Sequence, residues 1–252
     1  MGFKNMRFLL LITLAFLSLP VFAAKNISAL LLEQSDQLLL VQTPDWEANR
    51  GQMQFYQRSQ SGAPWEKVGE AITVVVGESG TAWGVELAQN KWAGPVKVEG
   101  DQRSPVGVFK LGPAFGFAPQ VEASFKLNYF PLTDSSVCVD DVKSHYYNQL
   151  LDSSSVAHPD WTSGESMRQV SVYQQGSVIQ YNMDQPVHGA GSCIFLHSWE
   201  GGEGGTAGCV ALDEARLKSI LSQLDSSRKP VMVILSAPAY QILKGKWDLP
   251  TN

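Results

Sequence analysis

Short apolar or β-branched runs recur along most of this chain, and turn residues such as those in NRG and SGAP separate them. Runs of five to seven residues are too short for typical helices, but they match the usual length of a strand. The pattern therefore predicts a mainly β fold. The predicted strands cover residues 37–43, 53–57, 72–76, 107–111, 177–181, 192–197 and 231–235.

Two segments depart from the strand pattern. Residues 213–224 place Leu217, Ile220, Leu221 and Leu224 on one stripe behind Asp213, a natural N-cap, which predicts an amphipathic helix. A shorter helix or a loop is expected over residues 146–151. With no internal repeat and no clear linker, 252 residues suit one β-rich domain with a few peripheral helices.

The N-terminus carries the pattern of a secretory signal. Lys4 and Arg7 precede the apolar run 8–19, which is too short to span a membrane, and Val21-Phe22-Ala23 supplies small residues for cleavage. We expect residues 1–23 to be a signal peptide and residues 24–252 to form a single domain without a membrane span. An uncleaved anchor is the alternative. No cysteine directly follows the run, which disfavours a lipid anchor.

The charge of the chain disfavours nucleic acid as a partner. The sequence has 19 basic and 24 acidic residues, and both Lys4 and Arg7 would leave with the signal peptide, so the mature chain has a net charge of −7. An acidic chain with no basic stripe repels phosphate backbones. There is also no P-loop and no GxGxxG at the start of a helix.

Cysteine is rare, with only Cys138, Cys193 and Cys209. In an oxidising compartment an odd count permits one disulfide and one reactive thiol. The count does not say which cysteines pair. A Cys138–Cys193 disulfide and two buried thiols are both open.

His197 and Cys209 flank a glycine-rich turn in FLHSWEGGEGGTAGCVAL, residues 195–212. An imidazole that takes the thiol proton creates a nucleophile that attacks carbonyls and forms a thioester. Alternation along the strand would place Phe195 and His197 on one face. The alternative is that Cys209 is a small core residue and that His197 only bonds to the backbone.

The turn itself offers further candidates. The amides of Gly208 and Cys209 could point at one spot and form an oxyanion hole. Thr206 could hydrogen-bond at the site or simply shape the turn. With no CxxC and no HxxxH, the sequence predicts neither a metal nor any other cofactor.

Several segments in order resemble the L,D-transpeptidase catalytic (YkuD-type) family, and they span residues 77–235. The segments are ESGTAWG at 78–84, DQRSPVGVFKLG at 101–112, VDDVKSHYYN at 139–148, IQYNMDQPVHGAGSCIFLH at 179–197 and TAGCVAL at 206–212.

The resemblance implies a β-sandwich or similarly β-rich fold and a secreted bacterial enzyme, in the periplasm or cell wall, that remodels peptidoglycan. Cys209 would be the nucleophile and His197 the general base. The substrate would be a peptidoglycan stem peptide, cut between a diamino acid and a D-amino acid.

The sequence also departs from the best-known family motif, Ser/Thr-His-Gly-Cys followed by an arginine. Here the tetrad is Thr206-Ala207-Gly208-Cys209, Ala211 stands where that arginine is expected, and the interval from His197 is shorter. We interpret these features as a shorter TAGC branch of the family. They leave open what binds a substrate carboxylate.

Other residues complete the prediction for substrate binding. Arg103 and Arg168 are candidates for the missing carboxylate clamp, with surface exposure as the alternative. Trp83 is a candidate groove wall or a packed core residue. Asp140 and Asp141 could bind a substrate amine or cap a turn, and His188 is expected in a nearby loop.

Three other functions stay open. An L,D-carboxypeptidase, or an amidase that releases proteins from peptidoglycan, would share the acyl-enzyme. A non-catalytic cell-wall-binding protein would keep only the fold. A cysteine protease acting on ordinary L-peptides is a further alternative, although no protease signature surrounds Cys209.

Overall fold

A computed structural model of the chain describes residues 27–121 and 124–250. The predicted signal peptide, residues 1–23, lies outside this part. None of the helices described there is long and apolar enough to cross a membrane.

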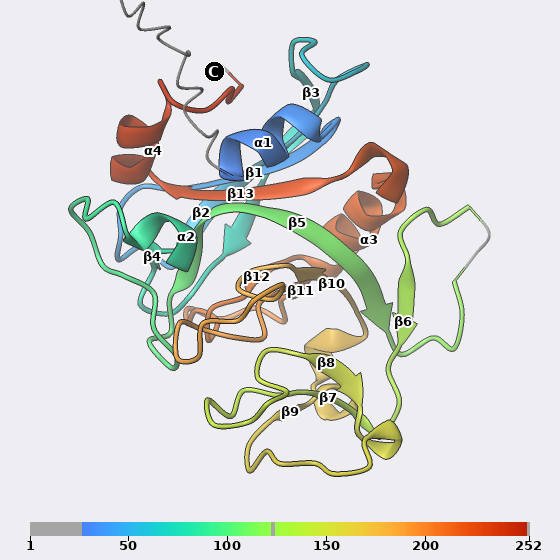
Figure 1. The fold of residues 1–252 in the computed structure, drawn as a ribbon. Helices are drawn as coiled ribbons and strands as arrows, with labels where there is room; N and C mark the ends of the chain where they lie inside the picture. The colour runs from blue at the N-terminus through green and yellow to red at the C-terminus, as the bar shows by residue number, and fades with distance from the viewer. Residues whose placement is uncertain (1–26, 122–123, 251–252) are drawn as a thin grey trace, which may run out of the picture.

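One large sheet dominates the structure (Figure 1), which confirms the mainly β prediction. Its strand order is β10-β11-β12-β3-β2-β1-β13-β5-β4, β6 joins β5, and a further pairing between β10 and β5 closes the path into a ring. The strands are β1 Gln37–Thr43, β2 Arg50–Gln57, β3 Glu66–Val75, β4 Thr81–Trp83, β5 Ser104–Gly116, β6 Tyr129–Pro131, β10 Gln175–Ile179, β11 Phe195–Ser198, β12 Val210–Leu212 and β13 Val231–Ser236.

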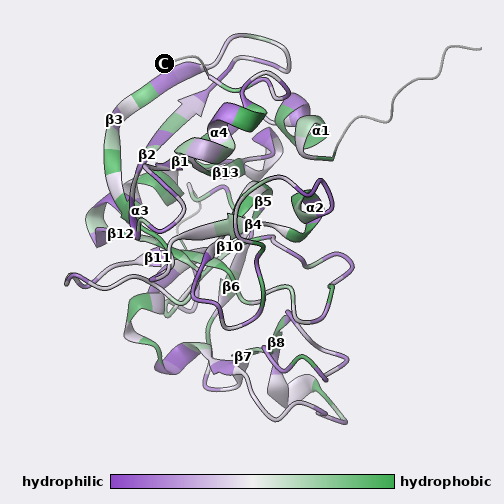
Figure 2. Cartoon of the chain, turned by 90° about the vertical axis from the view of Figure 1, so that its left-hand side faces the viewer, coloured by the Kyte–Doolittle hydropathy of each residue, from purple (hydrophilic) through white to green (hydrophobic). Residues whose placement is uncertain are grey.

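Strand β1 shows why a continuous apolar run predicts a strand in this chain. It pairs in parallel with β13 and antiparallel with β2, so both of its edges are hydrogen-bonded. Leu39 and Val41 belong to one apolar cluster, and Leu38 and Leu40 belong to another. A strand buried on both faces has no polar alternation, and QLLLVQT has none in its centre. By contrast β3 is mostly exposed and shows mixed hydropathy (Figure 2).

Helices cover the two apolar clusters. Leu217, Ile220 and Leu221 of α3 pack in the first cluster, while α1 and α4 contribute to the second. The predicted cap is confirmed, since the Asp213 carboxylate accepts a hydrogen bond from the Arg216 amide at 3.0 Å. The helices are α1 Ile27–Gln34, α2 Val85–Ala88, α3 Glu214–Gln223 and α4 Ala237–Leu243, and the 3₁₀ helices are η1 Ser153–Ser155, η2 Met167–Gln169, η3 Ser171–Tyr173 and η4 Ser226–Arg228.

A small second sheet projects from the large one (Figure 1). It has the order β8-β7-β9, with β7 Ser136–Cys138, β8 Leu150–Asp152 and β9 Glu165–Ser166. The helix considered for residues 146–151 does not form. Turns lead instead into β8, because Asn148 adopts a left-handed φ of 62° that ends any helical run.

Candidate active site

A cavity of about 530 Å³ lies between the large sheet and the small one. It receives side chains and backbone from β9, η3, β11 and the turn before β12, so segments far apart in the sequence meet there. The residues that line it are Glu99, Gly100, Asp140, Glu165, Val170, Val172, Tyr173, Ser192, Cys193, Ile194, His197, Trp199, Thr206, Ala207, Gly208 and Cys209.

Cys209 lies immediately before β12 and is 6% exposed. Its sulfur accepts a hydrogen bond from the Phe195 amide at 3.3 Å and donates to the Cys193 carbonyl at 3.5 Å. It forms no disulfide. The sulfur therefore remains a free thiol, positioned by the backbone of the neighbouring segment.

His197 lies on β11, which runs parallel to β12 and pairs His197 with Ala211, two residues beyond Cys209. The His197 Nδ1 atom contacts the Ser198 carbonyl at 2.7 Å, so in the neutral ring Nδ1–H donates and Nε2 is the basic nitrogen. The described part of the chain provides no hydrogen bond to Nε2. The Ser198 carbonyl therefore fixes the orientation and the tautomer of the imidazole.

Tyr173 packs against His197 and against Phe195, two residues earlier on β11. Its ring makes edge contacts with His197 at 5.2 Å and with Phe195 at 5.5 Å between centroids. The Tyr173 hydroxyl donates to Glu165 Oε1 at 2.9 Å. Sequence reasoning did not identify this residue, because no motif singles out a tyrosine at the end of a 3₁₀ turn.

Burial keeps both the Cys209 thiol and the His197 imidazole uncharged. It lowers the pKa of His197 to about 4, against a smaller upward effect of the hydrogen bond with Ser198. Burial, together with a smaller effect of the negative charge of Glu165, raises the pKa of Cys209 to about 12. At neutral pH the pair is therefore a neutral thiol and a neutral imidazole, so a thiol that attacked a carbonyl here would have to lose its proton during the attack.

The turn before Cys209 is built around Thr206. The Thr206 hydroxyl donates to the Cys209 carbonyl at 2.7 Å and accepts from the Gly208 amide at 3.1 Å. Gly208 has a φ of +150°, and a Cβ there would lie 3.1 Å from the Arg103 carbonyl. Thr206 therefore shapes the turn. The missing side chain of Gly208 lets the turn lie close to the backbone of Arg103.

These bonds correct the predicted oxyanion hole. The Gly208 amide already donates to Thr206, so it is not directed at a substrate oxygen. The Cys209 amide remains the candidate donor from this turn.

Ser104 braces the same turn from β5 and was not singled out by the sequence. It is fully buried, and its hydroxyl lies 2.7 Å from the Gly208 carbonyl and 3.1 Å from the Cys209 carbonyl. The hydroxyl also accepts from the Gly77 amide at 3.0 Å. Ser104 of the RSP stretch therefore connects that stretch to the TAGC turn.

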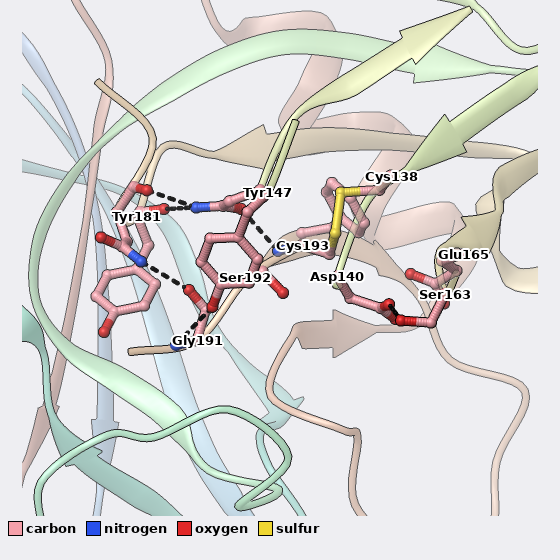
Figure 3. The surroundings of a disulfide bond; sticks show 12 residues. Cys138, Asp140, Tyr147, Ser163, Glu165, Tyr181, Gly191, Ser192 and Cys193 are labelled. Carbon is pink, nitrogen blue, oxygen red and sulfur yellow. Dashed lines mark hydrogen bonds between the residues drawn. A yellow bond between two sulfur atoms is a disulfide. The ribbon is translucent and has the colours of Figure 1, made fainter. Parts of the chain in front are cut away.

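Cys138 and Cys193 form a disulfide, which settles the alternative left open by the sequence (Figure 3). The bond joins β7 of the small sheet to the segment before β11. Because the Cys193 carbonyl also accepts from the Cys209 thiol, this bond connects the small sheet directly to the candidate nucleophile.

The predicted carboxylate clamp does not lie at the cavity. The Arg103 guanidinium donates to the carbonyls of Trp46 and Thr81 at 2.9 and 3.1 Å, and Arg168 stacks 3.8 Å over the Phe117 ring. Neither is among the lining residues. Position 211, where the family motif has an arginine, holds an alanine that is fully buried in β12, so it supplies no cation to the cavity.

Trp83 is 1% exposed and belongs to the second apolar cluster, with its indole N–H bonded to the Ala93 carbonyl at 3.0 Å. Its place is therefore the core, and the groove-wall prediction is corrected because neighbouring rings of Trp46 and Trp92 enclose it. His188 lies in a loop, as expected, stacked on Tyr147.

The two aspartates of the VDD stretch separate in role. Asp141 caps turns, since its carboxylate accepts from the amides of Lys143 and Thr162, and these bonds lower its pKa. Asp140 lines the cavity and accepts from the Ser163 hydroxyl at 2.5 Å. In the described ranges no three His, Cys, Asp or Glu side chains are grouped so as to hold a metal ion.

Comparison with known proteins gives one result. The family model of the L,D-transpeptidase catalytic domain, YkuD, matches residues 48–233. No curated protein and no solved structure gives a significant match. The matched range contains the cavity and every element of the turn described above.

Proposed function

The chain belongs to the YkuD family of L,D-transpeptidase catalytic domains, and we propose that it is a secreted cysteine acyltransferase acting on peptidoglycan stem peptides. Membership of the family supports a peptidoglycan enzyme of the L,D-transpeptidase type. The single observation that carries the finer proposal is that one cavity contains both the free thiol of Cys209 and the imidazole of His197, whose Nε2 has no hydrogen-bond partner among the described residues.

The first half-reaction forms a thioester. The Cys209 sulfur attacks the carbonyl carbon of the diamino acid, and the thiol proton passes to Nε2 of His197. The tetrahedral intermediate then breaks its carbon–nitrogen bond. His197 returns the proton to the departing D-amino acid, which leaves as a free amine.

The second half-reaction decides the product. An amine from another stem peptide attacks the thioester, gives its proton to His197, and releases the sulfur, which regains a proton. This sequence makes a cross-link. Water in place of the amine gives a shortened peptide, the carboxypeptidase outcome, by the same steps.

Burial of the cavity supports chemistry on a bound substrate rather than a permanently activated thiolate. The raised pKa of Cys209 and the lowered pKa of His197 keep the resting pair neutral. A neutral thiol is a poor target for passing electrophiles, so substrate binding would select the reaction.

Purified mature chain incubated with a disaccharide tetrapeptide, followed by mass spectrometry of the products, tests the proposal. Cross-linked dimers indicate transfer, and tripeptide alone indicates hydrolysis. Cys209→Ala is the matched control and must give neither. A folded wild-type chain that yields no product from several muropeptides, with Cys209 intact by mass, would contradict both reactions and leave the wall-binding function.

A further inference from the structure

The cavity is lined by three carboxylates and no opposing cation. Glu99, Asp140 and Glu165 belong to its wall, and no lysine or arginine is among the described residues that line it. His197, with its pKa lowered to about 4, adds no positive charge at neutral pH. The site is therefore negatively charged, although the sequence predicted an arginine clamp for a substrate carboxylate.

Glu165 is fixed relative to the nucleophile by covalent and hydrogen-bonded connections. It pairs across the small sheet with Cys138, whose disulfide partner Cys193 accepts the hydrogen bond from the Cys209 thiol. One oxygen of Glu165 accepts from Tyr173, whose ring touches His197. This carboxylate is thus part of the same framework as the catalytic pair.

Asp140 lies beside Glu165 on the same side of the disulfide (Figure 3). One of its oxygens accepts from Ser163, and the described residues donate nothing to the other. Burial raises the pKa of Glu165, the hydrogen bond from Tyr173 opposes this shift, and the charge of Asp140 makes a smaller upward contribution. Two carboxylates that repel one another in a cavity are stabilised by a bound cation.

A second observation concerns the imidazole of His197, which lines the same cavity. His197 is 5% exposed and lines the cavity, yet its Nε2 has no hydrogen-bond partner among the described residues. His197 lines the cavity, and its Nε2 is not among the fully buried atoms that lack a partner, so a ligand or water in the cavity can reach this nitrogen. A substrate group that donates a hydrogen bond to Nε2 of His197 would therefore lie in the same cavity as the carboxylates of Asp140 and Glu165.

We propose that Asp140 and Glu165 bind a primary ammonium group that the peptide substrate carries near the carbonyl attacked by Cys209. The inference rests on the proposed function and names the group by which this site recognises its substrate. The side-chain amine of a diamino acid in the stem peptide has this chemistry. In this chain Asp140 and Glu165 would recognise an ammonium group of the substrate. The best-known family motif instead has an arginine at the position of Ala211, which would recognise a substrate carboxylate.

Binding to the Cys209→Ala chain tests the proposal without turnover. We compare a stem tetrapeptide that has a free side-chain amine with the same peptide acetylated at that amine, by calorimetry. Charge-assisted hydrogen bonds contribute about 1.5–3 kcal/mol, so the free amine should bind about 10–100-fold more tightly. Equal affinity for the two peptides would overturn the proposal.

Conservative variants test whether Asp140 and Glu165 cause the preference for the free amine. Adding Glu165→Gln or Asp140→Asn to the Cys209→Ala chain keeps an oxygen that accepts from Tyr173 or Ser163, but removes the charge. Each should reduce the preference for the free amine at least several-fold. Asp184→Asn is the matched control, since this exposed carboxylate pairs with Lys110 and lies away from the cavity. A preference unchanged in both cavity variants would contradict the assignment.

A second readout separates charge from structure. In the Glu165→Gln chain with Cys209 present, the pH profile of thiol alkylation should move to lower pH, because the charge of Glu165 contributes to the raised pKa of Cys209. If the wild type is active on both peptides with equal kcat/KM, the ammonium site is wrong but the proposed function stands. If the free-amine peptide binds selectively but is never turned over, the ammonium site stands and the proposed function is wrong.

Discussion

The large sheet and the small sheet are built by different means, and each contributes a different part of the site. The large sheet positions Cys209 and His197 by strand pairing, with apolar clusters on both faces. The small sheet has three strands of two or three residues and depends on a disulfide to join the segment before β11. Backbone pairing thus positions Cys209 and His197, while the disulfide positions Glu165 of the small sheet and the neighbouring Asp140 beside them.

Removing the reacting atoms should have the largest effect. We expect Cys209→Ala and His197→Gln each to lower kcat/KM by about 10³-fold or more, because each removes a group that takes part in both half-reactions. Product formation measured by mass spectrometry checks this. A Cys209→Ala chain with more than a tenth of wild-type turnover would remove the thiol from the mechanism.

Removing the disulfide should distinguish the two sheets. The bond closes a sequence separation of 55 residues, so Cys138→Ala with Cys193→Ala should lower the free energy of unfolding by about 2–4 kcal/mol. Chemical denaturation measures the loss. The far-ultraviolet circular dichroism of the folded variant should stay close to that of the wild type, since the large sheet does not contain the bond. Loss of the whole β signal in buffer would show that the two sheets are not separable.

Acid should weaken the large sheet through His197. The folded-state pKa is about 4 and the ordinary value is 6.5, so the unfolded chain binds a proton first as pH falls. Stability therefore decreases between pH 6.5 and pH 4, by about 3 kcal/mol from this group. Urea unfolding across this range measures it. His197→Gln should lose this part of the slope, and an unchanged slope would contradict the assigned burial.

Ser104→Ala should loosen the turn that carries Cys209. It removes a buried hydroxyl that contacts the Gly208 and Cys209 carbonyls and the Gly77 amide, at an expected cost of about 1–3 kcal/mol. Thermal unfolding measures the cost, and the rate of Cys209 alkylation should rise as the turn opens. Ser154→Ala, at an exposed turn, is the control and should change alkylation little.

The smallest effect is expected at Arg168. Its guanidinium stacks on Phe117 outside the cavity, so Arg168→Ala should cost about 0.5–1 kcal/mol of stability and leave KM within twofold. Steady-state kinetics with the tetrapeptide checks this. A tenfold rise in KM would restore the carboxylate clamp that the sequence predicted.

The sequence predicted β1 and β13 well because residues buried on both faces are apolar throughout, but it predicted only parts of the longest strands, β3 and β5. It missed the short strands of the small sheet, since β9 has only two residues and its position depends on Cys138. Helices α1 and α4 were missed because their apolar residues serve the second cluster, which only the folded sheet defines.

For the site, local motifs indicated Cys209, His197 and the turn residue Thr206. They could not indicate Ser104, Tyr173 or Glu165 in their observed roles, because each acts through a contact across many residues of sequence. Arg103 and Trp83 were singled out for their chemical type, but the backbone carbonyls around Arg103 and the indole rings around Trp83 fix them elsewhere.

The parallel pairing of β11 with β12 has one more consequence. Side chains alternate between the two faces of a strand, so a slip of a single residue would turn His197 to the face opposite Cys209. Turnover is then possible only for molecules whose strands have met in one alignment. Catalytic competence in this enzyme would be a direct assay of correct folding, more sensitive than any measure of total strand content.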